Sequence, residues 1–179
     1  MELEIVVEEL APQLLRYALG RTGDPSLAEE VAQEALAALV QRWRRHGPPD
    51  CPAAFAFVIA RRRARRESFK RRLLFPLSVL FDRESAEPGP EERAASRTDF
   101  ARMLTALKKL SARDREALLL VTVGELGHGE AARVLEISLS ALKMRVHRAR
   151  QRLQQLVEDP KEWKEWTDAK ARETLSASD

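Results

Sequence analysis

The segment Ala131–Leu153 (AARVLEISLSALKMRVHRARQRL) has the pattern of two amphipathic helices joined by a tight turn. In its second half, Leu142, Val146, Ala149 and Leu153 are spaced four, three and four residues apart. At about 100° per residue these positions share one side of an α-helix, whereas a half-buried strand would need alternation with a period of two. The segment therefore predicts a helical hairpin whose second helix has one apolar stripe.

Outside its apolar stripe, the second helix of this segment is rich in basic residues. It carries five basic residues and no acid, namely Lys143, Arg145, Arg148, Arg150 and Arg152. The residues opposite the stripe are Ser140, Met144, His147, Arg148 and Gln151. Solvated helices usually mix acids with bases for i,i+4 pairing, so the bias favours a helix-turn-helix that enters the major groove of DNA. The alternative is a helical hairpin whose basic side is only solvated.

The turn between the two helices has signals of its own. Ile137 is expected to be buried between the helices, and the hydroxyl of Ser138 is expected to cap the second helix. The first helix contributes a small apolar face made of Ala131, Ala132, Val134 and Leu135. These features agree with a helix-turn-helix.

Helical patterns dominate the rest of the chain, and strand patterns are nearly absent. Asp24-Pro25 combines an N-cap with a first-turn proline, and apolar residues then recur in steps of four from Leu27 to Trp43. The predicted fold class is all-α: two small helical bundles joined by a flexible acidic linker, the second containing the helix-turn-helix. The expected helices cover 12–21, 25–44, 52 onward, 112–123, about 128–135, and 139–157.

A boundary is expected between the two bundles. Glu84–Glu92 is acidic and contains Pro-Gly-Pro, so it cannot bury enough apolar surface to order itself. The apolar run just before it, LLFPLSVLF, is expected to pack against this chain or a partner. A short tail helix with Trp163 and Trp166 follows the second bundle. The predicted divisions are the first bundle at 1–75, the linker at 76–99, the second bundle at 100–158 and the tail at 159–179.

Charge is distributed in blocks that the net charge of +3 conceals. Residues 1–40 carry two basic and eight acidic residues, whereas residues 41–72 carry eleven basic and two acidic ones. Like charges at i,i+4 destabilise a helix unless an anion meets them, so this second basic block predicts another contact with nucleic acid. Trp43, Phe55 and Phe57 border it, either as core residues or as platforms for unpaired bases.

The sequence contains no pattern of a catalytic or metal centre. A single cysteine, Cys51, excludes an intramolecular disulfide, and the three histidines are scattered, so no zinc site is expected. The run GELGHG at 124–129 lacks the Gly-Lys-Ser/Thr of a phosphate loop. No apolar run approaches the ~20 residues of a membrane span, and the acidic start is unlike a signal peptide. We expect a cytoplasmic, non-enzymatic protein with no cofactor, metal or membrane contact.

Two separate blocks of the chain resemble the extracytoplasmic-function (ECF) class of bacterial RNA polymerase sigma factors. Gly23–Leu36 (GDPSLAEEVAQEAL) is similar to the Gly-Asp-x-x-x-Ala-Glu-Asp-x-Val-Gln-Glu motif of the class, and Phe55–Arg61 to its Trp-Leu-Tyr-x-Ile-Ala-Arg helix. In the second half, Leu110–Leu120 resembles Leu-Pro-x-x-x-Arg-Glu-x-x-x-Leu, and Glu130–Leu153 resembles the helix-turn-helix motif of the class. The second block alone could belong to a LuxR-like regulator, but the two blocks together, in this order, are specific.

The resemblance implies a promoter-recognition subunit that binds core RNA polymerase, at its clamp helices and flap, and promoter DNA. An anti-sigma factor is a further implied partner. The first bundle would dock on polymerase through Glu30, Gln33, Glu34, Ala37, Gln41 and Arg42. It would open the minus-ten element with Phe55, Arg61, Arg62, Arg65 and Arg66, and the loop Arg45–Ala54 would help hold the unstacked strand.

The second bundle would read the minus-thirty-five element. The residues implied in this contact are Ser140, Lys143, Met144, Arg145, His147 and Arg148. Several positions depart from the class, and one of them is Gly127, which replaces the usual Ser cap of the helix before the turn. Arg62 and Arg66 replace an Asn and an Asp, which shifts the first bundle toward phosphate contact, and Ala141 replaces a phosphate-contacting Thr. Glu136 replaces the turn glycine, so the turn must tolerate a side chain or adopt a different φ.

Two other functions fit parts of the sequence. A stand-alone helix-turn-helix regulator would bind DNA without polymerase. A helical decoy would bind an anti-sigma factor through the helix from Leu27 to Trp43. The block Gly23–Arg72 favours the sigma factor, because a plain DNA-binding regulator has no use for it.

Overall fold

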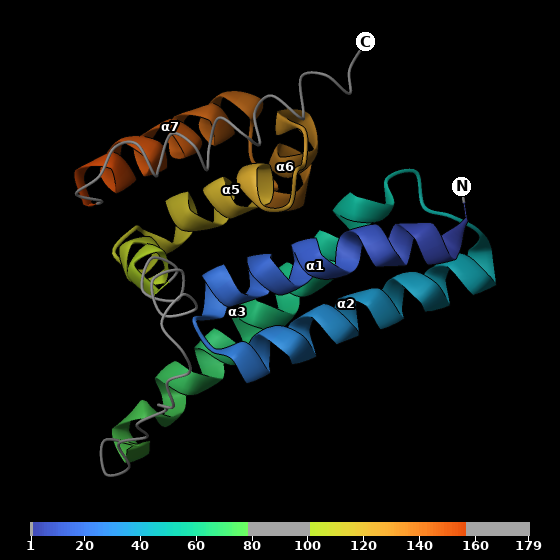
Figure 1. Cartoon of the computed structure of the whole chain (residues 1–179), viewed down its shortest axis with the longest axis horizontal. Coiled ribbons are helices and arrows are strands. Elements are labelled where there is room, and N and C mark those ends of the chain that lie inside the picture. Colours follow the sequence, from blue (N-terminus) through green and yellow to red (C-terminus); the bar gives the residue numbers. More distant parts are fainter. Residues whose placement is uncertain (1, 79–100, 157–179) are drawn as a thin grey trace, which may run out of the picture.

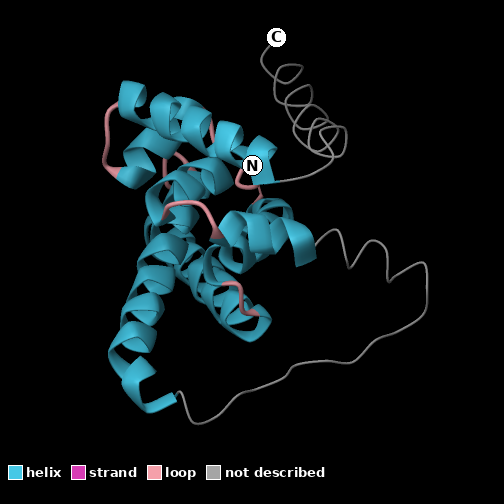
Figure 2. Ribbon diagram, turned by 90° about the vertical axis from the view of Figure 1, so that its left-hand side faces the viewer, coloured by secondary structure: helices cyan, strands magenta, loops and turns pink. Residues whose placement is uncertain are grey.

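The computed structural model describes residues 2–78 and 101–156, with side chains described up to Glu67 in the first range. Every regular element in these residues is a helix, which confirms the all-α prediction (Figures 1 and 2). The elements are α1 (Leu3–Thr22), α2 (Pro25–His46), α3 (Pro52–Ser78), a helical stretch at 101–108, α5 (Ala112–Thr122), α6 (His128–Leu135) and α7 (Leu139–Leu156).

The first bundle consists of α1, α2 and α3, and the second contains α5, α6 and α7 (Figure 1). α3 continues to Ser78, three residues into the predicted linker. The rest of that linker, including Glu84–Glu92, and the tail with its two tryptophans lie outside the described residues. The predicted helices at 112–123, 128–135 and 139–157 agree with α5, α6 and α7 to within one residue at each end.

The start of α1 corrects the sequence prediction. We expected a helix from Pro12, because proline favours the first turn, but α1 begins at Leu3 and includes Pro12 in its interior. Val6 and Leu10 are buried on the same side as Leu14. Apolar burial of this extra length outweighs the hydrogen bond that a proline cannot donate inside a helix.

The predicted N-cap of α2 is confirmed. The Asp24 carboxylate accepts a hydrogen bond from the backbone N–H of Leu27 at 3.1 Å, and Pro25 occupies the first turn. The helix ends at Gly47, whose φ of 75° is left-handed. The apolar stripe faces the core with Leu27, Ala28, Val31, Ala32, Ala35 and Leu39.

Two aromatic side chains form the centre of the first bundle. Tyr17 of α1 and Phe57 of α3 are both completely buried, and their rings meet edge to face with centroids 5.2 Å apart. Burial, and after it the charge of Glu116, raise the pKa of the Tyr17 hydroxyl well above its usual range, so the phenol is neutral at physiological pH. Phe57 is therefore a core residue, as one of the two interpretations predicted.

The helix-turn-helix forms as its sequence predicts. Leu142, Val146, Ala149 and Leu153 are the buried residues of α7. The Ser138 hydroxyl accepts from the backbone N–H of Ala141 at 3.2 Å and so caps α7. The predicted stripe and cap are both confirmed, and most other described residues of α7 are exposed.

Glu136 ends α6 in the left-handed region, with φ 57° and ψ 46°. This conformation lets its N–H donate to the carbonyl of Arg133 at 3.1 Å, and that of Ile137 to Ala132 at 3.0 Å. The turn thus keeps the geometry that glycine would favour and places a non-glycine residue in it.

We expect Glu136→Gly to raise the free energy of unfolding by about 1 kcal/mol, because a side chain in the left-handed region is strained and glycine is not. Chemical unfolding of the full chain, followed by circular dichroism, measures the change. Glu136→Ala removes the same carboxylate but keeps the strain, so it should give no gain. Equal gains from both variants would show that charge, not backbone strain, controls this turn.

Candidate nucleic-acid interface

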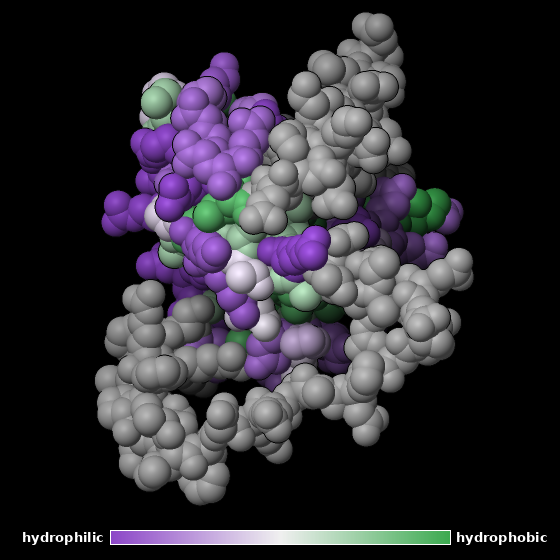
Figure 3. All heavy atoms as spheres, turned by 60° about the vertical axis from the view of Figure 1, so that its left-hand side comes forward, coloured by the Kyte–Doolittle hydropathy of each residue, from purple (hydrophilic) through white to green (hydrophobic). Residues whose placement is uncertain are grey.

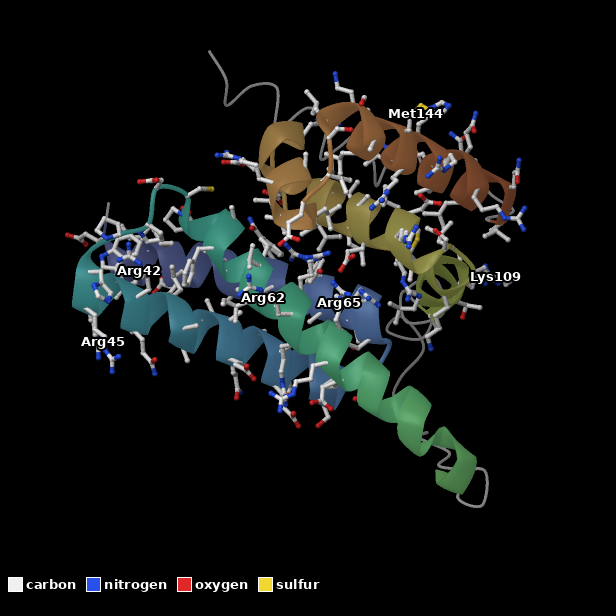
Figure 4. The ribbon with its side chains drawn as sticks, turned by 180° about the vertical axis from the view of Figure 1, so that it is seen from behind. Arg42, Arg45, Arg62, Arg65, Lys109 and Met144 are labelled. Atoms are coloured by element: carbon white, nitrogen blue, oxygen red, sulfur yellow. The ribbon has the colours of Figure 1, made fainter. Side chains whose placement is uncertain are left out.

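The outer side of α7 presents the side chains that the sequence assigned to DNA. Met144 is 54% exposed and points away from the bundle (Figure 4). The other exposed members are Ser140, Lys143, His147 and Arg148, whereas Arg145 is half-buried. Hydrophilic residues form most of the described surface in the upper part of Figure 3, and α7 also exposes two apolar side chains, Leu139 and Met144. Residues that are adjacent on this side come from one rigid helix, so their spacing is fixed.

Arg148 is held by a residue that the sequence did not identify. Its Nη2 atom lies 3.0 Å from Oδ1 of Asp114, which is in the first turn of α5 and is mostly buried. Ser111 accepts a hydrogen bond from the backbone N–H of Asp114 at 3.1 Å and so caps that turn. No sequence signal links residues 34 positions apart, so only the packing of α5 on α7 reveals this pair.

The arginines of α3 fall into two groups. Arg62, Arg65 and Arg66 are exposed, and Figure 4 shows Arg62 and Arg65 on neighbouring turns of the helix. Arg61 is different, because only 13% of its side chain is exposed. Phe55 is half-buried against the core. The predicted minus-ten residues thus include three accessible cations and one covered cation.

A third group of charges links α3 to α2. Arg63 lies 3.3 Å from Glu30, 3.0 Å from Glu34 and 2.8 Å from Glu67. Only 20% of the Arg63 side chain is exposed, whereas those of Glu30 and Glu34 are more than half exposed. The sequence did not predict this cluster, which neutralises one of the arginines of the basic block.

The predicted polymerase-docking residues share one exposed side of α2, with one exception. Glu30, Gln33, Glu34, Ala37 and Gln41 are exposed at positions three or four residues apart. Arg42 is half-buried, and its Nη1 donates to the carbonyl of Gly47 at 2.9 Å, which caps the end of α2. Arg42 is thus occupied by a structural contact at the far end of the helix.

The two bundles meet at a buried carboxylate that the sequence did not identify. Glu116 of α5 lies 3.5 Å from Nε of Arg21 on α1 and 3.5 Å from Nε of Arg61 on α3. All three side chains are at least 87% buried. An ion cluster therefore joins α1, α3 and α5 at the interface between the bundles.

Polar contacts also join the loop before α3 to the second bundle. The Cys51 thiol donates to Glu130 of α6 at 3.0 Å. Burial first, and then this hydrogen bond, raise the pKa of the Cys51 thiol, so the thiol is largely protonated near neutral pH. On α1, the amide of Gln13 donates to Glu125 at 3.4 Å. The Arg45–Ala54 loop, expected near single-stranded DNA, is thus in contact with α6.

Within the described ranges, no group of three or more His, Cys, Asp or Glu side chains is arranged to hold a metal ion. The helices in those ranges also include none that is long and apolar enough to cross a membrane.

Comparison with protein families matches each bundle to a separate domain. Residues 6–73 match the family described as Sigma-70 region 2, and residues 100–153 match Sigma-70, region 4. The first bundle and the second bundle thus each correspond to one described region, in the order that the sequence motifs implied.

Comparison with individual proteins also identifies sigma factors. ECF RNA polymerase sigma factor SigD of Mycobacterium tuberculosis is 34% identical over 161 residues, which cover 84% of this chain and 74% of SigD. RNA polymerase sigma factor CnrH of Cupriavidus metallidurans is 37% identical over 94 residues, 49% of each chain. A solved structure of the sigma factor RpoE in complex with the anti-sigma factor NepR, from Bartonella quintana, matches with a TM-score of 0.70 at 25% identity, covering 88% of this chain and 97% of that one.

Both halves of the chain therefore carry the regions of one kind of transcription factor, and the alignment with SigD extends over both halves. The stand-alone regulator and the decoy would each account for only one of the two bundles. The chain belongs to the ECF class of RNA polymerase sigma factors, the subunits that bind core RNA polymerase and direct initiation at specific promoters.

Proposed function

We propose that three helices divide the work of promoter recognition: α2 docks on core RNA polymerase, α3 contacts the minus-ten element, and α7 reads the minus-thirty-five element. The observation that carries this assignment is α7, whose apolar stripe is buried while its basic and polar side is open. Such a helix fits the major groove, where phosphate contacts fix the register and side chains reach base edges.

The exposed side of α2 is suited to a basic protein surface. Two of its three exposed acids, Glu30 and Glu34, are positioned by the same Arg63 side chain. A surface whose side chains are already ordered loses less conformational entropy when it binds. This supports α2 as the helix that meets the clamp helices of polymerase.

Asp114 supports the reading of bases by Arg148. The ion pair holds one nitrogen of the guanidinium group at 3.0 Å, and the fork carries further N–H donors that can reach a base. Arginine reads guanine through two such donors, and a side chain that is held in place reads more selectively than a mobile one. We assign Asp114 as a positioning residue for Arg148.

We expect Arg148→Ala to lose about 1–3 kcal/mol of discrimination between bases of the minus-thirty-five element, because a base-reading pair is removed. Footprinting of holoenzyme across minus-thirty-five variants measures the change. Arg152→Ala is the matched control, since Arg152 bonds to Gln155 near the end of the same helix; it should weaken binding evenly across sequences. Identical footprints for Arg148→Ala and wild type would contradict the assignment.

The proposal as a whole is tested by co-purification of the full chain with core polymerase, followed by run-off transcription. A sigma factor binds core and starts transcripts at defined positions. A stand-alone regulator would bind DNA and fail to associate with core. A decoy would neither bind DNA nor promote initiation. We propose that the chain acts without catalytic chemistry of its own, in the cytoplasm, where its polymerase and DNA partners are found.

A second role is supported by the match to RpoE, which was solved with the anti-sigma factor NepR. Because that match covers 88% of this chain, it includes both bundles. We propose that an anti-sigma factor binds this chain as well. The test is whether a protein that co-purifies with the tagged chain inhibits its run-off transcription; co-purification of polymerase alone would contradict this role.

A further inference from the structure

The buried contact between the bundles carries an excess of positive charge. Glu116 supplies one carboxylate, whereas Arg21 and Arg61 supply two guanidinium groups whose Nε atoms approach the same oxygen, Oε1. A third cation is close by, since burial and then the charge of Arg21 lower the pKa of the Arg115 guanidinium. Glu116 therefore meets two guanidinium groups directly and a third one nearby, in surroundings that water hardly reaches.

This carboxylate is a distant partner for both arginines, with its Oε1 3.5 Å from each Nε. Arg21 donates to Glu116 at 3.5 Å, which is long for a charged hydrogen bond. The buried Nε of Arg61 has no hydrogen-bond partner. A phosphate offers more acceptor oxygens than a carboxylate, and guanidinium groups bind it through paired N–H donors. The two arginines are thus better suited to a phosphate than to the carboxylate that they now hold.

We propose that Arg21 and Arg61 form a binding site for a backbone phosphate of promoter DNA near the minus-ten element, and that Glu116 occupies this site while the bundles are packed together. The inference rests on the proposed function, because it places the minus-ten DNA on the first bundle. It adds Arg21, on α1, to the DNA-binding residues of α3. Closure of the bundles and DNA binding at this site exclude each other.

Close packing around Glu116 keeps the site covered. A Cβ atom on Gly20 would lie 2.7 Å from Cδ2 of Leu119, and one on Gly124 would lie 2.9 Å from Cζ of Phe57. Both glycines therefore let the bundles approach closely. This approach excludes water from the ion cluster, which strengthens the attraction between its charges.

The closed arrangement cannot serve both promoter elements at once. Positions minus ten and minus thirty-five are separated by about 25 base pairs, roughly 85 Å at ~3.4 Å per pair. α7 is only about 27 Å long at ~1.5 Å per residue, and its bundle contacts the first one directly. Residues 79–100 could span up to ~75 Å if fully extended. The covalent chain therefore permits a separation that would release the arginines from Glu116.

The test compares the wild-type full chain with Glu116→Gln, which keeps the size of the side chain and removes its charge. Cys51, the one thiol of the chain, reports closure because its sulfur contacts Glu130 across the interface. We expect iodoacetamide to alkylate Cys51 about fivefold faster in the variant, and a fluorescent bubble duplex of generic sequence to bind about fivefold tighter. The slope of log affinity against log salt should steepen by about 1, since one more phosphate contact becomes available.

Two further variants separate the parts of the proposal. Glu9→Gln removes the same charge from an exposed position of α1 and should change neither alkylation nor DNA affinity. Arg21→Ala added to Glu116→Gln should abolish the gain in DNA affinity and leave alkylation fast. If that double variant binds as tightly as Glu116→Gln, Arg21 does not contact phosphate. If Glu116→Gln matches the wild type in both measurements, Glu116 does not hold the bundles closed.

Run-off transcription by the wild-type chain with core polymerase judges the proposed function independently. A chain that supports no transcription would refute that function, whereas the alkylation and affinity measurements on the free chain would still decide whether Glu116 covers a phosphate site. Far-ultraviolet circular dichroism of each variant confirms that it has folded. A loss of helicity in Glu116→Gln would itself contradict the proposal, because it would give the carboxylate a role in folding.

Discussion

Replacing Arg62, Arg65 and Arg66 together by alanine is expected to reduce formation of open complexes about 10- to 100-fold at ~0.15 M salt, because each exposed arginine neutralises one phosphate. The three side chains lie on one accessible side of α3. They are not engaged in the ion cluster that holds Arg63 to α2. Loss of three such contacts should also reduce the slope of log affinity against log salt by about 2–3.

The measurement is open-complex formation by holoenzyme, followed by permanganate footprinting over a series of salt concentrations. A triple Lys variant at the same positions is the charge-matched control. It should keep most of the salt slope, since the slope depends on the number of phosphates neutralised and not on the geometry of the cationic group. Arg16→Ala, at an exposed position of α1, should leave both measurements unchanged. An alanine triple variant with an unaltered salt slope would remove these residues from the DNA contact.

Phe57→Ala is expected to lower the free energy of unfolding by about 3–5 kcal/mol, the usual cost of truncating a fully buried aromatic side chain. Phe57 is completely buried, contacts the ring of Tyr17, and lies against Gly124 of the second bundle. A bundle of this size has little stability to lose. At about 4–8 °C per kcal/mol, the midpoint of thermal unfolding should fall by more than 10 °C.

Differential scanning calorimetry of the full chain measures this change. Ile5→Ala is the control, because Ile5 is an apolar residue of the same bundle that is 51% exposed; its effect should stay within about 0.5 kcal/mol. A Phe57→Ala variant that unfolds at the wild-type temperature would mean that the ring is not part of the core. In that case the alternative of a base-stacking platform would have to be reconsidered.

Local patterns were sufficient to predict most helices. The stripe of α7, the cap at Ser138 and the start of α2 at Pro25 all depend on residues within a few positions of one another. Such signals are readable because a helix repeats every 3.6 residues and its ends need specific partners. The exception was α1, where a proline normally placed in the first turn lies inside a helix that continues to bury apolar residues.

The candidate site also has one part that local sequence predicts and another part that it does not predict. The exposed side of α7 could be predicted from the position of its stripe, and Met144, His147 and Arg148 are exposed as expected. The partners of the arginines could not be predicted, since Arg148 meets Asp114 across 34 residues and Arg21 meets Glu116 across 95. Sequence spacing carries no information on such pairs, which form only when helices pack.

The sequence by itself determined the helical class, the two-bundle organisation and the side of α7 that is free for DNA, because these follow from periodicity, caps and charge along one helix. The tertiary structure alone decided which charges are available. It places Arg63 among three glutamates and covers Arg61 with Glu116, while Arg62 remains exposed one position away. The physical reason is that the availability of a charge depends on its neighbours in space, and distant segments of the chain supply those neighbours.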